Sequence, residues 1–167
     1  FSSAQDWGGI QIADQPKGSS LPNFIRMDPP RHTEQRRTVA PIVAPTNLAN
    51  MEGLIRRRTA EVLDGLPRGE TFDWVDRVST ELTALMLATL FDFPQEDRRR
   101  LTHWSDVAIA NVADKDAVVK SEAERMAELG EMGRIMAALW AERARQPPRF
   151  DLISMMAHAP ATQNMPM

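Results

Sequence analysis

The stretch Met27-Asp28-Pro29-Pro30-Arg31-His32-Thr33-Glu34-Gln35-Arg36-Arg37 decides how this sequence is interpreted. It predicts a helix start, because Asp28 is a good N-cap type and proline lacks the amide hydrogen that the first turn leaves unpaired. His32 and Arg36 are four residues apart, so they lie on one helix face. Two donors near a positive helix end suit an anion such as a pair of carboxylates or a phosphate. An ordinary solvated basic face explains the same spacing equally well.

The rest of the sequence has a helical pattern almost throughout. Loops are expected over residues 1–23 and 111–120, and the only strand candidate is Thr71–Phe72. The third expected helix has a broad apolar face, which predicts deep burial. The expected helices and the residues that cap or end them are about 29–43 ended by Pro45, 47–64 capped by Asn47, 74–92 capped by Asp73, 95–110, 121–145 opened by a Ser121/Glu124 capping box, and 152–158 capped by Asp151.

Composition limits the classes of protein to consider. The chain has 167 residues, a net charge of −3 and 43% hydrophobic residues, which are values typical of one globular domain. The acidic balance argues against a general nucleic-acid binder, because phosphate neutralisation needs a basic surface. No apolar run is long enough for a membrane span.

The sequence contains no cysteine. Disulfides, cysteine zinc sites and cysteine nucleophiles are therefore excluded within this chain. The histidines His32, His103 and His158 are isolated and lack metal-ligand spacing. There is also no glycine-rich phosphate loop and no Gly-x-Ser-x-Gly elbow. The residues thus predict no catalytic group and no metal ligand of the chain's own.

The pattern Asp28-Pro-Pro-x-His-Thr-x-x-Arg-Arg37 resembles the C-helix signature of bacterial cytochrome P450s, the haem-thiolate monooxygenases. Other segments fit that superfamily in the expected order along nearly the whole chain. Together they are similar to the branch that hydroxylates the terminal carbon of medium-chain alkanes. These segments are Phe24–Arg26, Val43–Pro45, Leu63–Val75, Ala88–Pro94 and Asp151–His158.

The resemblance implies a mainly α fold, namely a partial cytochrome P450 fold from the B′ region through helix H. We expect residues 1–167 to be a single partial domain, truncated at both ends. The central helix and the haem-thiolate loop are absent, because the chain has no cysteine and no oxygen-activating acidic-Thr helix. A relative that lost its haem is the alternative explanation of the missing cysteine.

The resemblance also implies a site. In the family, the histidine and the arginine of this signature hold the haem propionates, which places that role on His32 and Arg36 and implies haem b. Ile10 and Ile12 would touch substrate over the distal haem face. Val107, Ala108 and Ile109 would belong to a mobile lid over the pocket. For Ile10, Ile12 and the 107–109 segment, ordinary packing of loop or helix-end residues is an equally good interpretation.

The function implied is that of a fragment of a haem-dependent monooxygenase. Its parent would hydroxylate aliphatic C–H bonds, with the terminal carbon of medium-chain alkanes as the favoured target, using dioxygen and electrons from a ferredoxin and its reductase. Arg31, Arg37 and Arg56–Arg58 are candidates for the docking patch, although solubilising surface charge is the slightly favoured interpretation of Arg56–Arg58. Arg98–Arg100 is interpreted as a solubilising run. The expected location is the cytoplasm, and the fragment alone would be inactive. The alternative is a non-catalytic α-helical module that binds an acidic protein partner or a hydrophobic ligand.

Overall fold

The computed structural model describes residues 2, 4 and 24–165, and these residues contain helices and loops but no strand. The expected strand at Thr71–Phe72 is therefore wrong. Ile10 and Ile12 lie outside the described residues. The main helices are α1 (Arg31–Val39), α2 (Pro45–Asp64), α3 (Glu81–Phe91), α4 (Arg98–Ile109), α5 (Glu122–Arg143) and α6 (Leu152–His158), with 3-10 turns at Phe24–Arg26, Ala40–Val43 and Gln95–Asp97 and a π-helix at Val75–Thr80.

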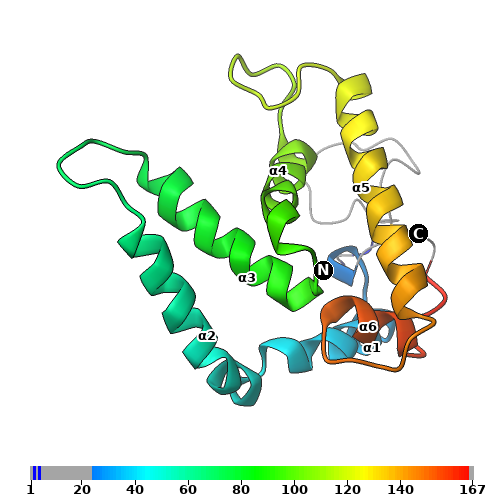
Figure 1. The fold of residues 1–167 in the computed structure, drawn as a ribbon. Coiled ribbons are helices and arrows are strands. Elements are labelled where there is room, and N and C mark those ends of the chain that lie inside the picture. The colour runs from blue at the N-terminus through cyan, green and yellow to red at the C-terminus, as the bar shows by residue number, and fades with distance from the viewer. Residues whose placement is uncertain (1, 3, 5–23, 166–167) are drawn as a thin grey trace.

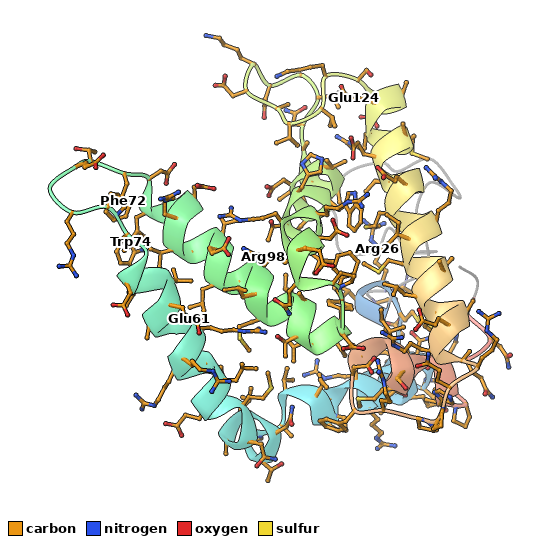
Figure 2. The ribbon with its side chains drawn as sticks, viewed as in Figure 1. Arg26, Glu61, Phe72, Trp74, Arg98 and Glu124 are labelled. Atoms are coloured by element: carbon orange, nitrogen blue, oxygen red, sulfur yellow. The ribbon has the colours of Figure 1, made fainter. Side chains whose placement is uncertain are left out.

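The helices pack side by side in a row that folds back at one end. The helices α2 and α3 form a hairpin, α3 packs on α4, and α4 packs on α5 (Figure 1). Phe72 in the loop of that hairpin lies beside Trp74 at the start of the following helical run, with ring centroids 6.2 Å apart (Figure 2). At the other end of the molecule α6 contacts α1, α3 and α5, so it joins α1 to the rest of the fold. No helix of the described residues is long and apolar enough to cross a membrane.

The hydrophobic core lies where α3, α4 and α5 meet. Its centre is Ala88, Phe93 and Trp104, which are at most 5% exposed. The Phe93 and Trp104 rings meet edge to face, with centroids 6.2 Å apart, and the Arg100 guanidinium lies 4.9 Å from the centre of the Trp104 ring. Half-buried aliphatic side chains of α5, Met132, Met136 and Leu139 among them, close the core from the other side.

The start signals of three helical segments are confirmed. The Ser121 hydroxyl accepts the Glu124 amide at 3.1 Å, and the Glu124 carboxylate accepts the Lys120 amide at 2.7 Å. Asp151 accepts the Ser154 amide at 2.8 Å at the start of α6. Asp73 accepts the Asp76 amide at 3.1 Å, where the helical run that leads into α3 begins. Because such caps involve residues within one turn of each other, they can be predicted from the sequence.

The expected boundaries around α1 are partly wrong. Pro30, not Asp28, is the N-cap residue of α1, and the Asp28 carboxylate instead accepts a hydrogen bond from the Ser2 hydroxyl. The helical run that begins with α1 ends at Val43, and Ala44 is extended with ψ 148°, so the predicted effect of Pro45 on the preceding residue is confirmed. Pro45 itself begins α2, because a proline fits the first helical position, where no amide hydrogen is required. Asn47 consequently lies inside α2, and its side-chain amide donates to the Ile42 carbonyl at 2.6 Å.

The deep burial expected for the third helix holds for Val78 and for the alanines of α3, but not for the whole apolar face. Ala84 and Ala88 are fully buried, whereas Val75 is 64% exposed. The first part of the expected helix, Val75–Thr80, is a π-helix, so its side chains do not follow the spacing of an α-helix. Small residues allow two helix backbones to approach closely, and this explains why the alanines of α3 are its buried positions.

Replacing Trp104 with Ala should lower the free energy of unfolding by about 3–5 kcal/mol, because it leaves a cavity at the centre of the core. Urea unfolding followed by circular dichroism measures the loss. Trp74→Ala is the matched control, since Trp74 is 54% exposed, and it should cost less than about 1 kcal/mol. An equal loss of unfolding free energy in the two variants would contradict the placement of the core around Trp104.

Candidate functional site

The helix α1 carries both predicted cofactor ligands. It begins after the two prolines, where the Glu34 amide donates to the Pro30 carbonyl at 3.0 Å and the His32 amide donates to the Asp28 carbonyl at 3.2 Å. His32 and Arg36 lie one turn apart on this helix, so their side chains extend from the same face. His32 is half-buried and Arg36 is exposed.

The exposed surface of α1 is positively charged. Arg31, Arg36 and Arg37 are exposed, and Glu34 is the only acidic residue of the helix. Among the described residues, Arg36 and Arg37 form no ion pair, so both guanidinium groups remain able to bind an anion.

The side of α1 next to His32 and Arg36 is covered. Gln35 is only 6% exposed. The segment that follows α6 lies against this face, and a hollow of about 170 Å³ remains between them. Residues Arg31, Glu34, Gln35, Pro160, Ala161, Asn164 and Met165 line the hollow. The segment after α6 thus holds α1 along this neighbouring side.

The donors on α1 fit the propionates of a haem. A half-buried imidazole and an exposed guanidinium one turn apart can bind two carboxylate oxygens by charge-assisted hydrogen bonds. The axial thiolate of a haem-thiolate enzyme has no candidate in a chain without cysteine. The arrangement on α1 can hold an anionic group.

The predicted lid residues at the end of α4 do not share one surface. Val107 is fully buried, whereas Ala108 is exposed and Ile109 is 81% exposed. Consecutive helical residues point in directions about 100° apart, so three neighbours cannot all face one pocket. Ala108 and Ile109 remain candidates for contact with an apolar ligand, while Val107 packs inside the protein.

A charged cluster that the sequence interpretation missed lines a second cavity. Arg98 donates to Glu81 at 2.6 Å, and Arg99 donates to Glu81 at 2.7 Å and to Asp76 at 2.8 Å. The third arginine of the run, Arg100, pairs with Glu131 at 2.5 Å. The run is therefore a set of contacts between helices and not merely a solubilising sequence. Spacing along the chain gives no signal for these pairs, because the partners lie 17 to 31 residues away.

The cavity beside this cluster has a volume of about 420 Å³ and lies between α2, α3 and the start of α4. Glu61 on α2 and Arg98 on α4 both line it (Figure 2). Burial opposes ionisation of Glu81, but the hydrogen bonds from Arg98 and Arg99 outweigh this effect and lower the pKa of the Glu81 carboxyl. Glu81 is therefore a charged anchor that holds α4 against α3.

Comparison with known proteins places this arrangement in a family. Linalool 8-monooxygenase from Pseudomonas putida is 31% identical over 169 residues, covering 95% of this chain and 40% of that protein. The structure of cytochrome P450-153 from Novosphingobium aromaticivorans superposes with a TM-score of 0.79 at 45% identity, covering 99% of this chain and 41% of that one. CYP153D17 from Sphingomonas sp. PAMC 26605 gives a TM-score of 0.74 at 47% identity, over 93% of this chain and 38% of that one. No protein-family model matches the chain.

The fold and the sequence together define a cytochrome P450 segment. The chain belongs to the cytochrome P450 superfamily, as the resemblance of the Asp28–Arg37 motif indicated. Its helices match part of the P450 fold, and the chain spans about 40% of the length of linalool 8-monooxygenase. The assignment of His32 and Arg36 to haem propionates stays a prediction.

The Glu81 cluster predicts a specific dependence of stability on pH. A lowered pKa in the folded state means that the carboxylate stabilises the fold above its ordinary value of 4.5, and that this contribution is lost as the pH falls through the lowered pKa. Glu81→Gln should therefore cost about 1–3 kcal/mol near pH 7 and much less at acidic pH, where the Glu81 carboxylate is protonated in the folded state.

Urea unfolding at both pH values tests this prediction. Glu96→Gln serves as the control, because Glu96 is exposed and forms no ion pair among the described residues. The same loss for Glu81→Gln at both pH values would show that the charge of Glu81 is not what stabilises the contact.

Proposed function

We propose that this chain is the segment of a haem monooxygenase that binds the haem propionates through His32 and Arg36. The observation that carries the proposal is the pair of donors on one face of α1, with the Arg36 guanidinium unpaired among the described residues. Membership of the cytochrome P450 superfamily supports it, because proteins of that superfamily bind haem. The covered side of α1, at Gln35, gives the helix a fixed position from which to present both side chains.

Each residue has a separate task in this proposal. Arg36 offers a planar fork of N–H donors that matches a carboxylate in two-point geometry. His32 donates a single hydrogen bond from a less exposed position, where a charged acceptor is held more strongly than in water. The positive end of α1 adds a favourable field for the carboxylate at His32, the second residue of the helix, whereas Arg36 lies in the last turn. The bound haem, ligated by a cysteine outside this chain, supplies the oxygen-activating chemistry.

For the substrate we propose an aliphatic compound that is oxidised at a C–H bond, with the chain end of a medium-length alkane as the favoured target. The likeness to cytochrome P450-153 and CYP153D17, at 45% and 47% identity, supports this branch. Ala108 and Ile109, exposed at the end of α4, are the described residues proposed to meet the substrate, and Val107 anchors that turn in the core. Ile10 and Ile12 belong to the same proposal.

We also propose a ferredoxin and its reductase as electron donors, acting in the cytoplasm. Exposed arginines on α1 and α2 provide a basic surface that would speed the encounter with an acidic protein. Arg58 does not belong to this exposed surface. Its side chain turns inward and donates to the Leu85 carbonyl at 2.5 Å and to the Thr89 hydroxyl. Burial lowers the pKa of Arg58. The surface proposed for docking therefore comprises Arg31, Arg37, Arg56 and Arg57.

Haem titration of the full polypeptide that contains this chain tests the function. Arg36→Ala should weaken haem binding by about tenfold or more, because one charge-assisted hydrogen bond contributes about 1.5–3 kcal/mol. Arg37→Ala is the matched control, as it removes an equally exposed arginine about 100° around the same helix, and it should leave haem affinity unchanged.

Two outcomes would contradict the proposal. If the polypeptide binds no haem, the chain is better explained as a non-catalytic binding module. If Arg36→Ala and Arg37→Ala weaken haem binding equally, the arginines act only through their overall charge and not by contact with a propionate.

A further inference from the structure

The helix α3 ends at an unusual residue. Asp92 has φ 51° and ψ 44°, which is the left-handed conformation, and it is the only described residue other than glycine with a positive φ. The Asp92 amide donates to the Thr89 carbonyl at 3.2 Å, and the Phe93 amide donates to the Ala88 carbonyl at 2.8 Å. Glycine or asparagine adopts this conformation at least as readily as aspartate. A carboxylate at this position therefore calls for an explanation based on its charge.

The Asp92 carboxylate receives two arginines from distant parts of the chain. Arg143, at the end of α5, donates from Nη2 to Asp92 Oδ2 at 2.7 Å, and its side chain is only 9% exposed. Arg149, in the loop between α5 and α6, donates to the same oxygen. One carboxylate thus joins the end of α3 to the end of α5 and to the loop that leads into α6.

Arg149 continues the connection to the start of α6. Its Nε lies 3.5 Å from Asp151 Oδ2, and its backbone amide donates to the Ser154 hydroxyl at 2.8 Å. Asp151 and Ser154 are both buried, and Asp151 caps α6 by accepting the Ser154 amide. The first turn of α6 is consequently held by contacts that begin at Asp92.

The helix α6 in turn supports α1. The two helices are in contact, and the segment after α6 covers the face of α1 that contains Gln35. That segment is itself tied back, because the buried Thr162 hydroxyl donates to the Met156 carbonyl at 2.6 Å. A shift of α6 would therefore move the surface against which α1 rests, and with it the neighbouring side chains of His32 and Arg36.

We infer that the Asp92 carboxylate is a positioning group for His32 and Arg36, acting through Arg149, Asp151 and α6. The inference rests on the proposed function, since it assigns to Asp92 the task of fixing the helix that holds the haem propionates. The Asp92 carboxylate acts indirectly, without contacting His32 or Arg36. It positions α6, and α6 in turn positions α1.

The variant Asp92→Asn removes the negative charge of the side chain and keeps the backbone conformation. Asparagine keeps the left-handed turn and a side-chain carbonyl oxygen, so the end of α3 is preserved while the attraction for Arg143 and Arg149 is lost. Arg149→Gln breaks the same connection from the other side at a residue that is 46% exposed, where folding tolerates a change. Asp64→Asn is the matched control, because Asp64 is exposed at the end of α2 and forms no ion pair among the described residues.

Two measurements on the full polypeptide test the inference. The first is amide hydrogen exchange of residues 31–39, measured without haem, and the second is haem affinity. Asp92→Asn should speed exchange in α1 and weaken haem binding by about three- to tenfold. Arg149→Gln should do the same, and the double variant should be no worse than either single one, because both break one path. Asp64→Asn should change neither quantity.

The outcomes separate this inference from the proposed function. Unchanged α1 exchange and unchanged haem affinity in Asp92→Asn, with normal haem binding by the parent protein, would overturn the role of Asp92 and leave the function standing. Faster exchange confined to α6 and the preceding loop would also overturn it, by showing a purely local structural role. A parent protein that binds no haem would refute the proposed function, and α1 exchange would still decide whether Asp92 positions that helix.

Discussion

The turn at Asp92 and Phe93 joins the two kinds of interaction that hold this structure together. The Phe93 ring enters the apolar core and meets Trp104 edge to face. The neighbouring Asp92 carboxylate faces the other way and binds Arg143 and Arg149. Because adjacent residues in one left-handed turn make both sets of contacts, the packing of α3 on α4 and the placement of α6 depend on the same few backbone angles.

This coupling matters because α1 is a weak helix by itself. It has nine residues, most of them polar, and a helix of that length is marginal in water without tertiary contacts. Its position comes from α6 and from the segment that covers Gln35. The stiffness of the proposed propionate site is therefore supplied by residues that lie well outside the Asp28–Arg37 motif.

The sequence predicted those features that depend on residues within one turn of each other. The caps at Ser121 and Asp151 and the one-face spacing of His32 and Arg36 are of this kind. Local rules failed for the N-caps expected at Asp28 and Asn47, because Pro30 is the N-cap residue of α1 and α2 already begins at Pro45. The Glu81 and Asp92 clusters were not foreseen, because their arginine partners lie 17 to 57 residues away and only the fold brings them together.

An experimental structure of the haem-bound polypeptide tests the central claim most directly. The quantity to measure is the distance from the Arg36 guanidinium nitrogens to the nearest propionate oxygen. Our account predicts about 2.7–2.9 Å, the length of a charge-assisted hydrogen bond, with His32 donating to a propionate from the same face of α1. Propionates bound by other residues, with Arg36 directed into solvent, would contradict the account.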